Sequence, residues 1–312
     1  MSLIEDPEIF RSVLESLQSG VYLVDRDQRI LFWNEGAEKI TGYLRQDVVG
    51  HFCRDNLLAQ AEGDKSVLSD AADAILSVLR DGKATFAEVS LRHKDGHRVF
   101  VRLRGVPVRN SHGTIVGAAE SFDENPSASA FDRRHDKLEG YGCLDSETGA
   151  LTHQLIHSHL RENLVTFAEH PVPFSILLIE IDRMDQFRAA YGKAVIPTIL
   201  RVVAQTLENS LRPTDFLGRH SDTQFLAVLS ECNATEIGLA ANRLKKMVGG
   251  SEVKWWGDGI PVTASFGAAS AIPGDSPESI LSRAEKALQI GLASGGNCVT
   301  VNAEGHKERS EV

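Results

Sequence analysis

One stretch restricts the fold of this chain more than any other: Pro173–Asp182, with the sequence PFSILLIEID. Its apolar residues follow one another almost without interruption, whereas a strand with one face in water would alternate apolar and polar side chains. The pattern predicts a central strand that is buried on both faces. A helix predicted at Ile199–Leu211 would pack on this strand through one apolar face, made by Leu200, Val203, Leu207 and Leu211.

The segment Arg212–Phe225, written RPTDFLGRHSDTQF, joins that helix to another apolar strand, Leu226–Leu229. Its composition predicts a strand–turn–strand with Ser221–Gln224 at the tip. The segment resembles the GGDEF domain of bacterial diguanylate cyclases, in which an R-x-x-D tetrad shortly precedes a Gly-Gly-acid-Glu-Phe hairpin. The tetrad is intact as Arg212–Asp215. The signature reads Ser221, Asp222, Thr223, Gln224, Phe225, and of these only Phe225 matches.

The flanking sequence resembles the same family in the expected order, from about Leu144 to Asn302. The matching positions are Asp145, Thr148 and Gly149 of the entry motif, Val262, Thr263, Ser265 and Gly267 of a strand predicted at Pro261–Ala269, and a last helix at Pro277–Leu292 with the turn Ser294–Asn297. The entry motif ends in Thr152-His153 instead of Asn-Arg. The resemblance implies an α/β sandwich around a mixed sheet, related to nucleotide cyclases.

The metal-binding positions of the family are mostly changed. Making cyclic di-GMP from two GTP is phosphoryl transfer, which needs metal ions held by carboxylates. The resemblance places one family acid on Glu180, which is still a carboxylate, and two others on Thr223 and Gln224. A hydroxyl and a neutral amide cannot balance the charge of a Mg²⁺ pair. The chain is therefore expected to keep Glu180 only as a vestigial ligand, with Mg²⁺ not expected as a cofactor.

The positions that hold the substrate are changed as well. The family's guanine-reading Asn and Asp fall on Arg188 and Pro197, and its phosphate-binding Lys and Arg fall on Leu292 and Gly296. Asp222 also places a negative charge where the family's hairpin approaches phosphate. These losses in metal, base and phosphate contacts together predict a domain without catalytic residues.

The tetrad leads to a different expectation. In cyclases of the family it is an inhibitory site that binds the product cyclic di-GMP, completed by an Arg on the following helix. The matching residues are Arg212, Asp215 and Arg243. Two Arg forks and one acid suit a ligand that carries phosphate and guanine. The alternative is a surface ion pair between Arg212 and Asp215, which would contribute little to the stability of the fold.

The first half of the chain predicts an amphipathic helix at Asp6–Leu17, followed by short strands and small helices. The expected strands are Val21–Asp25, Arg29–Trp33, Ala84–Arg92, His97–Val108 and Thr114–Phe122, and the expected helices are Glu35–Ile40, capped by Asn34, and Ser66–Leu79. This order, with GVYLVDRDQRILFWNEGAEKITGY and RHKDGHRVFVRLRGVPVRNSHGTIVGAAESF, resembles the PAS fold, an antiparallel sheet with small helices. The resemblance covers about Asp6 to Glu124.

No cofactor of the PAS domain is firmly indicated. The segment Gly50–Arg54 resembles the Gly-x-Asn-Cys-Arg of flavin-binding PAS domains, but Phe52 replaces the Asn, so Cys53 is expected to be a half-buried loop residue. Haem has no better support, since His51, His93 and His97 lie at turns and are expected to be solvated. In the second half, His153 and His157 share a helical face while His159 does not, and no zinc site is expected.

Composition limits the remaining classes of function. The net charge of −10 argues against broad binding of nucleic acid or acidic membranes. The four cysteines are far apart, no apolar run is long enough for a membrane span, and a cytoplasmic protein is expected. The expected divisions are an N-terminal helix at 1–20, a PAS sensor at 21–124, a linker at 125–143 with a short helix at 131–138, the GGDEF-like domain at 144–302, and a polar tail at 303–312.

Three functions follow from these residues. The favoured one is a PAS-linked signalling protein whose GGDEF domain is inactive and binds cyclic di-GMP at the tetrad. The second is a divergent but active enzyme, a diguanylate cyclase or another nucleotide enzyme using Glu180 and Asp182. The third is a scaffold without nucleotide binding, which dimerises through its PAS half or docks on a protein partner.

Overall fold

The long apolar stretch forms the central strand of a sheet, as its pattern predicts. In the computed structural model this strand is β6, Phe174–Ile181, in a five-stranded sheet of order β12-β11-β6-β8-β7. It pairs antiparallel with β8, Gln224–Ser230, and with β11, Ala264–Ser270. The edge strand β12, Val299–Val301, runs parallel to β11, so the sheet is mixed.

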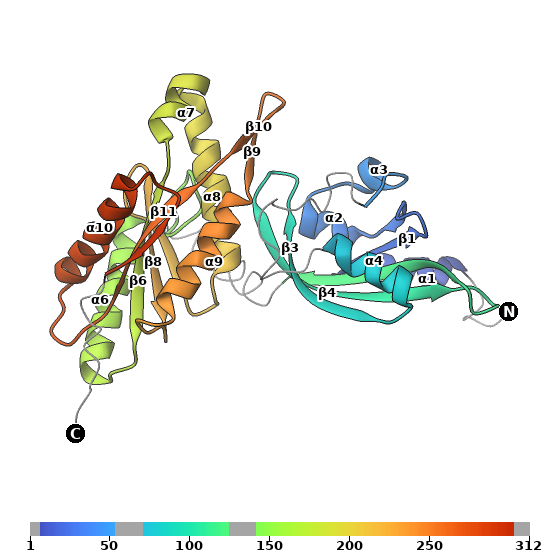
Figure 1. Ribbon diagram of the computed structural model, residues 1–312, viewed down its shortest axis with the longest axis horizontal. Coiled ribbons are helices and arrows are strands. Elements are labelled where there is room, and N and C mark those ends of the chain that lie inside the picture. The colour runs from blue at the N-terminus through green and yellow to red at the C-terminus, as the bar shows by residue number, and fades with distance from the viewer. Residues whose placement is uncertain (1–6, 54–70, 125–141, 303–312) are drawn as a thin grey trace. The chain divides into compact units, whose positions relative to one another are not determined.

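The structure describes residues 7–53, 71–124 and 142–302 (Figure 1). The chain divides into two units, Met1–Ser129 and Ala130–Val312. The helix expected at 131–138 and the polar tail at 303–312 lie outside the described residues. No helix in the described ranges is long and apolar enough to cross a lipid bilayer.

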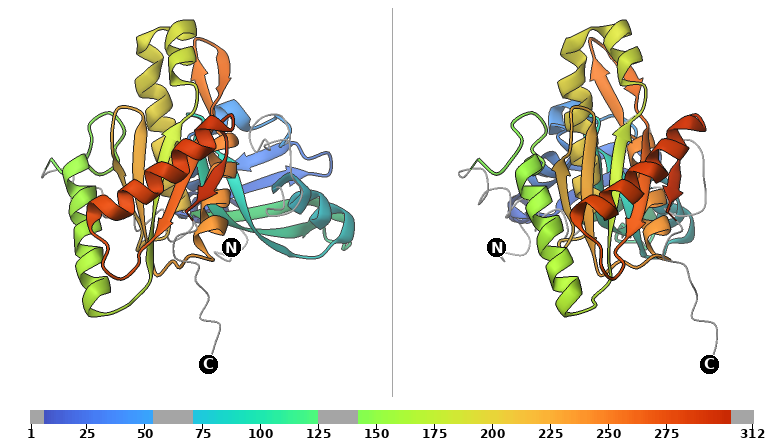
Figure 2. Two further views of the ribbon diagram at one scale, coloured as in Figure 1. Left: turned by 60° about the vertical axis from the view of Figure 1, so that its left-hand side comes forward. Right: turned by 90° about the vertical axis from the view of Figure 1, so that its left-hand side faces the viewer.

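Helices cover both faces of the C-terminal sheet, which explains why β6 is apolar along its whole length. Figure 1 shows α6, His153–Glu169, and α10, Pro277–Ala293, on one side, with α8, Ile196–Ser210, and α9, Ile237–Gly249, on the other. In the right-hand view of Figure 2, α6 and α10 lie in front of the strands. The four residues predicted to pack α8 on the sheet, Leu200, Val203, Leu207 and Leu211, are all buried.

The segment before β11 differs from the prediction. Pro261 ends a separate hairpin of β9, Glu252–Trp255, and β10, Asp258–Pro261, and the sheet strand begins only at Ala264. The hairpin turn carries Trp256, whose φ is 51° and which is 91% exposed. A proline cannot donate a ladder hydrogen bond, which suits the end of a short two-stranded hairpin better than the interior of a central sheet.

The N-terminal unit is an antiparallel sheet of order β2-β1-β5-β4-β3, with helices that contribute to the core on one face, as predicted. Its strands are β1 Gly20–Asp25, β2 Ile30–Trp33, β3 Thr85–Arg92, β4 Arg98–Arg109 and β5 Ile115–Glu124, and its helices are α1 Pro7–Ser16, α2 Glu35–Thr41, α3 Arg45–Val48 and α4 Ala71–Asp81. The predicted cap is confirmed, because the Asn34 side chain accepts a hydrogen bond from the Ala37 N–H at 2.9 Å.

Aromatic side chains fill the centre of this unit. The rings of Tyr22, Trp33 and Phe122 lie within 6.2 Å of one another, centroid to centroid, and Trp33 is only 1% exposed. The Tyr22 hydroxyl donates to the buried carboxyl of Glu120, and burial raises the pKa of Glu120 to about 8.

Two expectations about the PAS half are wrong. Cys53 is fully buried against the Tyr22 hydroxyl, and burial raises the pKa of its thiol to about 12, so the side chain is an inert core group. His97 is buried rather than solvated and stacks on His93 with ring centroids 4.2 Å apart. Desolvation lowers the pKa of His97 to about 3, so this histidine is neutral at physiological pH.

Candidate functional site

The tetrad forms a tight turn between the end of α8 and β7, Phe216–Arg219. Asp215 closes this turn: its carboxylate accepts the Arg212 backbone N–H at 2.9 Å and the Ser230 backbone N–H at 3.2 Å. Asp215 is only 7% exposed, whereas Arg212 is exposed. Asp215 is therefore a buried acceptor that shapes the turn.

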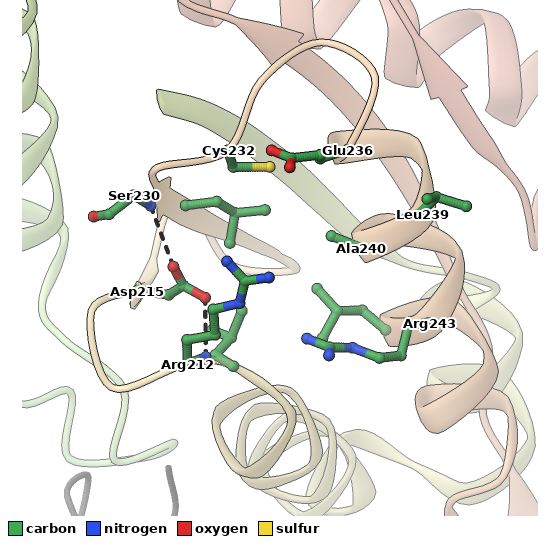
Figure 3. A pocket seen from close by; sticks show the side chains of 11 residues that line it. Arg212, Asp215, Ser230, Cys232, Glu236, Leu239, Ala240 and Arg243 are labelled. Carbon is green, nitrogen blue, oxygen red and sulfur yellow. Dashed lines mark hydrogen bonds between the residues drawn. The ribbon is translucent and has the colours of Figure 1, made fainter. Parts of the chain in front are cut away.

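Arg212, Asp215 and Arg243 line one pocket. This grouping could be predicted from the sequence only through the family resemblance. Figure 3 shows both guanidinium groups directed toward the space between the turn and α9. The pocket has a volume of about 240 Å³. Its other walls come from the end of α8, the end of β8 and α9, through Leu211, Leu229, Ser230, Cys232, Glu236, Leu239, Ala240 and Leu244.

The charges in the pocket favour an anion beside the two arginines. Desolvation and the charge of Arg212 lower the pKa of Arg243, yet a guanidinium remains charged at neutral pH. Burial raises the pKa of Asp215, an effect opposed by its two backbone hydrogen bonds and by both arginines. Arg243 is held by a bond from Nη2 to the Ser210 carbonyl at 2.9 Å, so one fork is already oriented. Glu236, the other acid of the pocket, lies near Cys232 and away from Arg243 (Figure 3).

Ser221, Asp222 and Thr223 of the changed signature form the tip between β7 and β8, close to the prediction, whereas Gln224 already begins β8. The tip is closed on itself: the backbone N–H groups of His220 and Ser221 both donate to the Gln224 carbonyl, at 2.9 and 3.2 Å. Arg219 holds the other side, with Nε 2.5 Å from the Ser221 carbonyl and Nη2 2.5 Å from the Asp222 carbonyl. Two N–H groups that could face a phosphate are therefore already used inside the hairpin.

The acidic residues beside the hairpin have different environments. Glu180 is half-buried and lies in register between Gln224 and Ser265. Asp182 is buried and accepts three hydrogen bonds, from Thr263 Oγ1 and Ser265 Oγ at 2.7 Å each and from the Asn297 backbone N–H at 2.9 Å. Asp182 thus fastens the turn after α10 to the sheet. The remaining donors, one carboxylate with Thr223 and Gln224, do not fit a Mg²⁺ pair.

The guanine and phosphate positions carry groups with other roles. Arg188 pairs with Asp185 at 2.7 Å on the exposed side of α7, Met184–Tyr191. Pro197 lies in the first turn of α8, and Leu292 lies in the last turn of α10. Gly296 has a φ of 77°, and a Cβ there would come within 2.9 Å of Asp182 Oδ1, so the position requires glycine.

The histidines of α6 are placed only partly as expected. His153 and His157 stack with ring centroids 4.2 Å apart, whereas His159 stacks on Phe216. His220, at the end of β7, joins His153 and His157, and ligand nitrogens of the three lie within 4.8 Å of one another. His220 was not predicted to join this group, because its partners are distant in the chain. The signal available was its place directly after β7, the strand that neighbours α6.

The matches to known protein families agree with this architecture. Residues 143–298 match the family described as diguanylate cyclase, GGDEF domain, and residues 18–123 match a PAS domain. Diguanylate cyclase A of Treponema denticola is 31% identical over 147 residues, which is 46% of this chain and 40% of that protein. The probable diguanylate cyclase DgcE of Escherichia coli is 24% identical over 99% of this chain but only 28% of its own length. The chain thus spans well under half of these curated relatives.

Solved structures show the same fold. The diguanylate cyclase SiaD of Pseudomonas aeruginosa, solved in complex with its activator SiaC, superposes with a TM-score of 0.51 at 23% identity, over 54% of this chain and 66% of that one. The GGDEF domain of DgcB from Caulobacter crescentus, solved in complex with c-di-GMP, gives 0.50 at 21% identity, over 51% and 93%. Because the family model matches residues 143–298, half of the chain, this chain belongs to the GGDEF domain family of diguanylate cyclases, with a PAS domain ahead of the GGDEF domain.

Proposed function

We propose that the GGDEF domain of this protein does not synthesise cyclic di-GMP and instead binds it, in the pocket of Arg212, Asp215 and Arg243, as the receptor part of a PAS-linked regulator. The observation that carries the proposal is the convergence of two guanidinium groups and a buried carboxylate on one cavity. The hairpin, by contrast, has lost the acids that catalysis requires.

The chemistry of the pocket suits this ligand. An Arg fork can pair with a phosphate, or with the O6/N7 edge of guanine, through two parallel hydrogen bonds. Each Asp215 oxygen keeps acceptor capacity beyond its backbone partner, because a carboxylate oxygen carries two lone pairs. A related domain, that of DgcB, was solved in complex with c-di-GMP. The cavity of about 240 Å³ is smaller than a site that encloses a whole ligand, so part of the dinucleotide would lie on the surface beside Leu239.

Calorimetric titration of the full chain with cyclic di-GMP tests the proposal. The wild type should bind in the micromolar range or tighter. Arg212→Ala should weaken binding about tenfold to a hundredfold, because a charge-assisted hydrogen bond contributes about 1.5–3 kcal/mol and ~1.4 kcal/mol is one decade. Arg212→Lys should recover little of this loss, since an ammonium group cannot form the two-pronged contact.

Arg201→Ala is the matched control, because Arg201 is an exposed arginine on α8 that lies outside the pocket. Binding by this variant should equal that of the wild type. Absence of binding by the wild type at high micromolar ligand, or equal binding by Arg212→Ala, would leave the protein a scaffold rather than a receptor.

We also propose that the PAS half forms a homodimer contact. The supporting observation is the apolar surface of α1 and the residue after it, where Phe10 and Val13 are each 53% exposed and Leu17 is 41% exposed. Removal of residues 1–124 should convert a dimer to a monomer in light scattering. Phe10→Ser with Val13→Ser should do the same in the full chain, and an unchanged mass in both cases would reject the contact.

A further inference from the structure

Three histidines from two distant segments gather beside the changed signature hairpin. His153 and His157 are one turn apart on α6, and His220 follows β7. Each offers one ring nitrogen, and these nitrogens all lie within 4.8 Å of one another. His153 is exposed while His157 and His220 are half-buried, so the cluster is open to solvent on one side.

Backbone hydrogen bonds bring the two segments that carry these side chains together. Leu151, just before α6, accepts a hydrogen bond from the Arg219 N–H at 2.8 Å and donates to the Leu217 carbonyl at 3.1 Å. Gly218 permits this close approach, because a Cβ at that position would lie 2.4 Å from the Ile156 Cβ. The end of β7 is thereby fixed against the first turn of α6, and His220 is delivered to His157.

Histidine is suited to a ligand role at neutral pH. An imidazole of ordinary pKa, about 6.5, is mostly neutral above pH 7, and the neutral form is the one that coordinates metals.

The spacing is close to what coordination requires. His157 Nε2 and His220 Nδ1 are 3.1 Å apart, with a hydrogen bond between them. In a tetrahedral zinc site with Zn–N distances of about 2.0–2.1 Å, two ligand nitrogens are separated by about 3.3 Å. Rotation of the His153 ring would bring in the third nitrogen, since its centroid is 4.2 Å from that of His157 and 5.8 Å from that of His220.

We propose that His153, His157 and His220 form a binding site for a divalent transition metal ion, with zinc as the ion of best fit, which fastens the β7–β8 hairpin to α6. Imidazole is a good ligand for zinc, copper and nickel and a poor one for magnesium or calcium. Three protein ligands leave a fourth position for water or an acid. The negative charge of Glu285 on α10 favours a cation beside His220, whereas the positive charge of Arg161 on α6 disfavours a cation beside His157.

Binding of zinc to the full chain, after removal of metals with a chelator, tests this site. Titration near neutral pH should show one zinc ion per chain and a rise in the thermal midpoint, because an ion that binds only the folded state stabilises it. His157→Gln and His220→Gln should each weaken zinc at least about tenfold, as expected for loss of one of three ligands. Both variants should keep the circular dichroism spectrum of the wild type.

His170→Gln is the matched control, since His170 is an exposed histidine at the end of the same helix. It should bind zinc like the wild type. Cobalt in place of zinc should give a visible absorption spectrum without the near-ultraviolet thiolate band, which separates this site from binding at Cys143 or Cys298. The proposal is overturned if the wild type does not bind one zinc ion per chain when zinc is present at tens of micromolar. It is also overturned if both Gln variants bind zinc as tightly as the wild type.

Discussion

The two ends of the β7–β8 strand pair differ in their charge. At one end, the turn of Arg212 and Asp215 faces Arg243 and presents two cationic forks around a buried carboxylate. At the other end, the signature tip carries a hydroxyl and an amide where the family has acids, and the N–H groups of His220 and Ser221 are bonded within the hairpin. A single short strand pair therefore separates a pocket with two guanidinium groups and a buried carboxylate from a hairpin tip with neutral side chains at two family acid positions. The comparison teaches that the same fold accommodates large changes in side-chain chemistry at one end of a strand pair without changes at the other.

The largest effect is expected at the catalytic end. The wild type, incubated with GTP and Mg²⁺ or Mn²⁺, should give no cyclic di-GMP above a blank without protein, measured by chromatography beside an active cyclase. The double variant Thr223→Asp and Gln224→Glu should also remain inactive, because Pro197, Leu292 and Gly296 still lack groups for guanine and phosphate. Turnover by the wild type that disappears in Glu180→Ala would break the comparison, since both ends would then be functional.

An intermediate effect is expected at the pocket end. Asp215→Ala leaves the backbone N–H groups of Arg212 and Ser230 without their acceptor, which should cost about 1–3 kcal/mol in the free energy of unfolding. Urea denaturation of the full chain followed at the C-terminal unit measures this loss.

Arg243→Ala is the companion variant, because it removes a pocket charge but no acceptor of the turn. This variant should bind cyclic di-GMP more weakly than the wild type does. Its loss in the free energy of unfolding should be smaller than that of Asp215→Ala. Equal stability of Asp215→Ala and the wild type would show that the carboxylate is not needed to shape the turn.

The smallest effect is a pH dependence at the hairpin end. The pKa of His157 is about 4 in the folded chain, below its ordinary value, so the unfolded chain takes up the proton first. The contribution of neutral His157 to the free energy of unfolding is fully present above about pH 6.5 and is lost as pH falls toward about 4. Because His157 is only partly buried, solvent screening should keep the loss below about 1–2 kcal/mol. In metal-free protein, His157→Gln should flatten this part of the stability profile, and a slope that persists in the variant would assign it elsewhere.

Local sequence patterns predict most of the fold, because the forces that form the elements are local. The apolar run of β6 and the cap at Asn34 each carry their signal within a few residues. The tetrad and Arg243 could be predicted to meet only through the family resemblance. The pattern could not give the burial of Asp215, since that depends on the Ser230 N–H across the β7–β8 pair.

The errors share a physical cause. Cys53 and His97 lie near turns, where polar side chains are usually solvated, yet the packing of the whole PAS sheet buries both. His220 reaches His157 through contacts of the β7 backbone with α6, and a close approach at a glycine leaves no periodic signal in the sequence. Contacts between elements therefore determine the surroundings of these three side chains. Such contacts form only in the folded chain, so local sequence patterns do not reveal them.

The positions of the tryptophans give each unit of the protein its own optical reporter. Trp33 is enclosed by Tyr22 and Phe122 in the PAS core, whereas Trp256 projects from the β9–β10 turn almost entirely into water. Emission from an enclosed indole shifts to longer wavelength when its surroundings become wet, while an indole already in water changes little. Trp255, half-buried beside Trp256, would also shift on exposure, so replacing it with Phe leaves Trp33 as the enclosed indole whose emission follows opening of the PAS core. Collisional quenching of Trp256 then follows access to the β9–β10 turn.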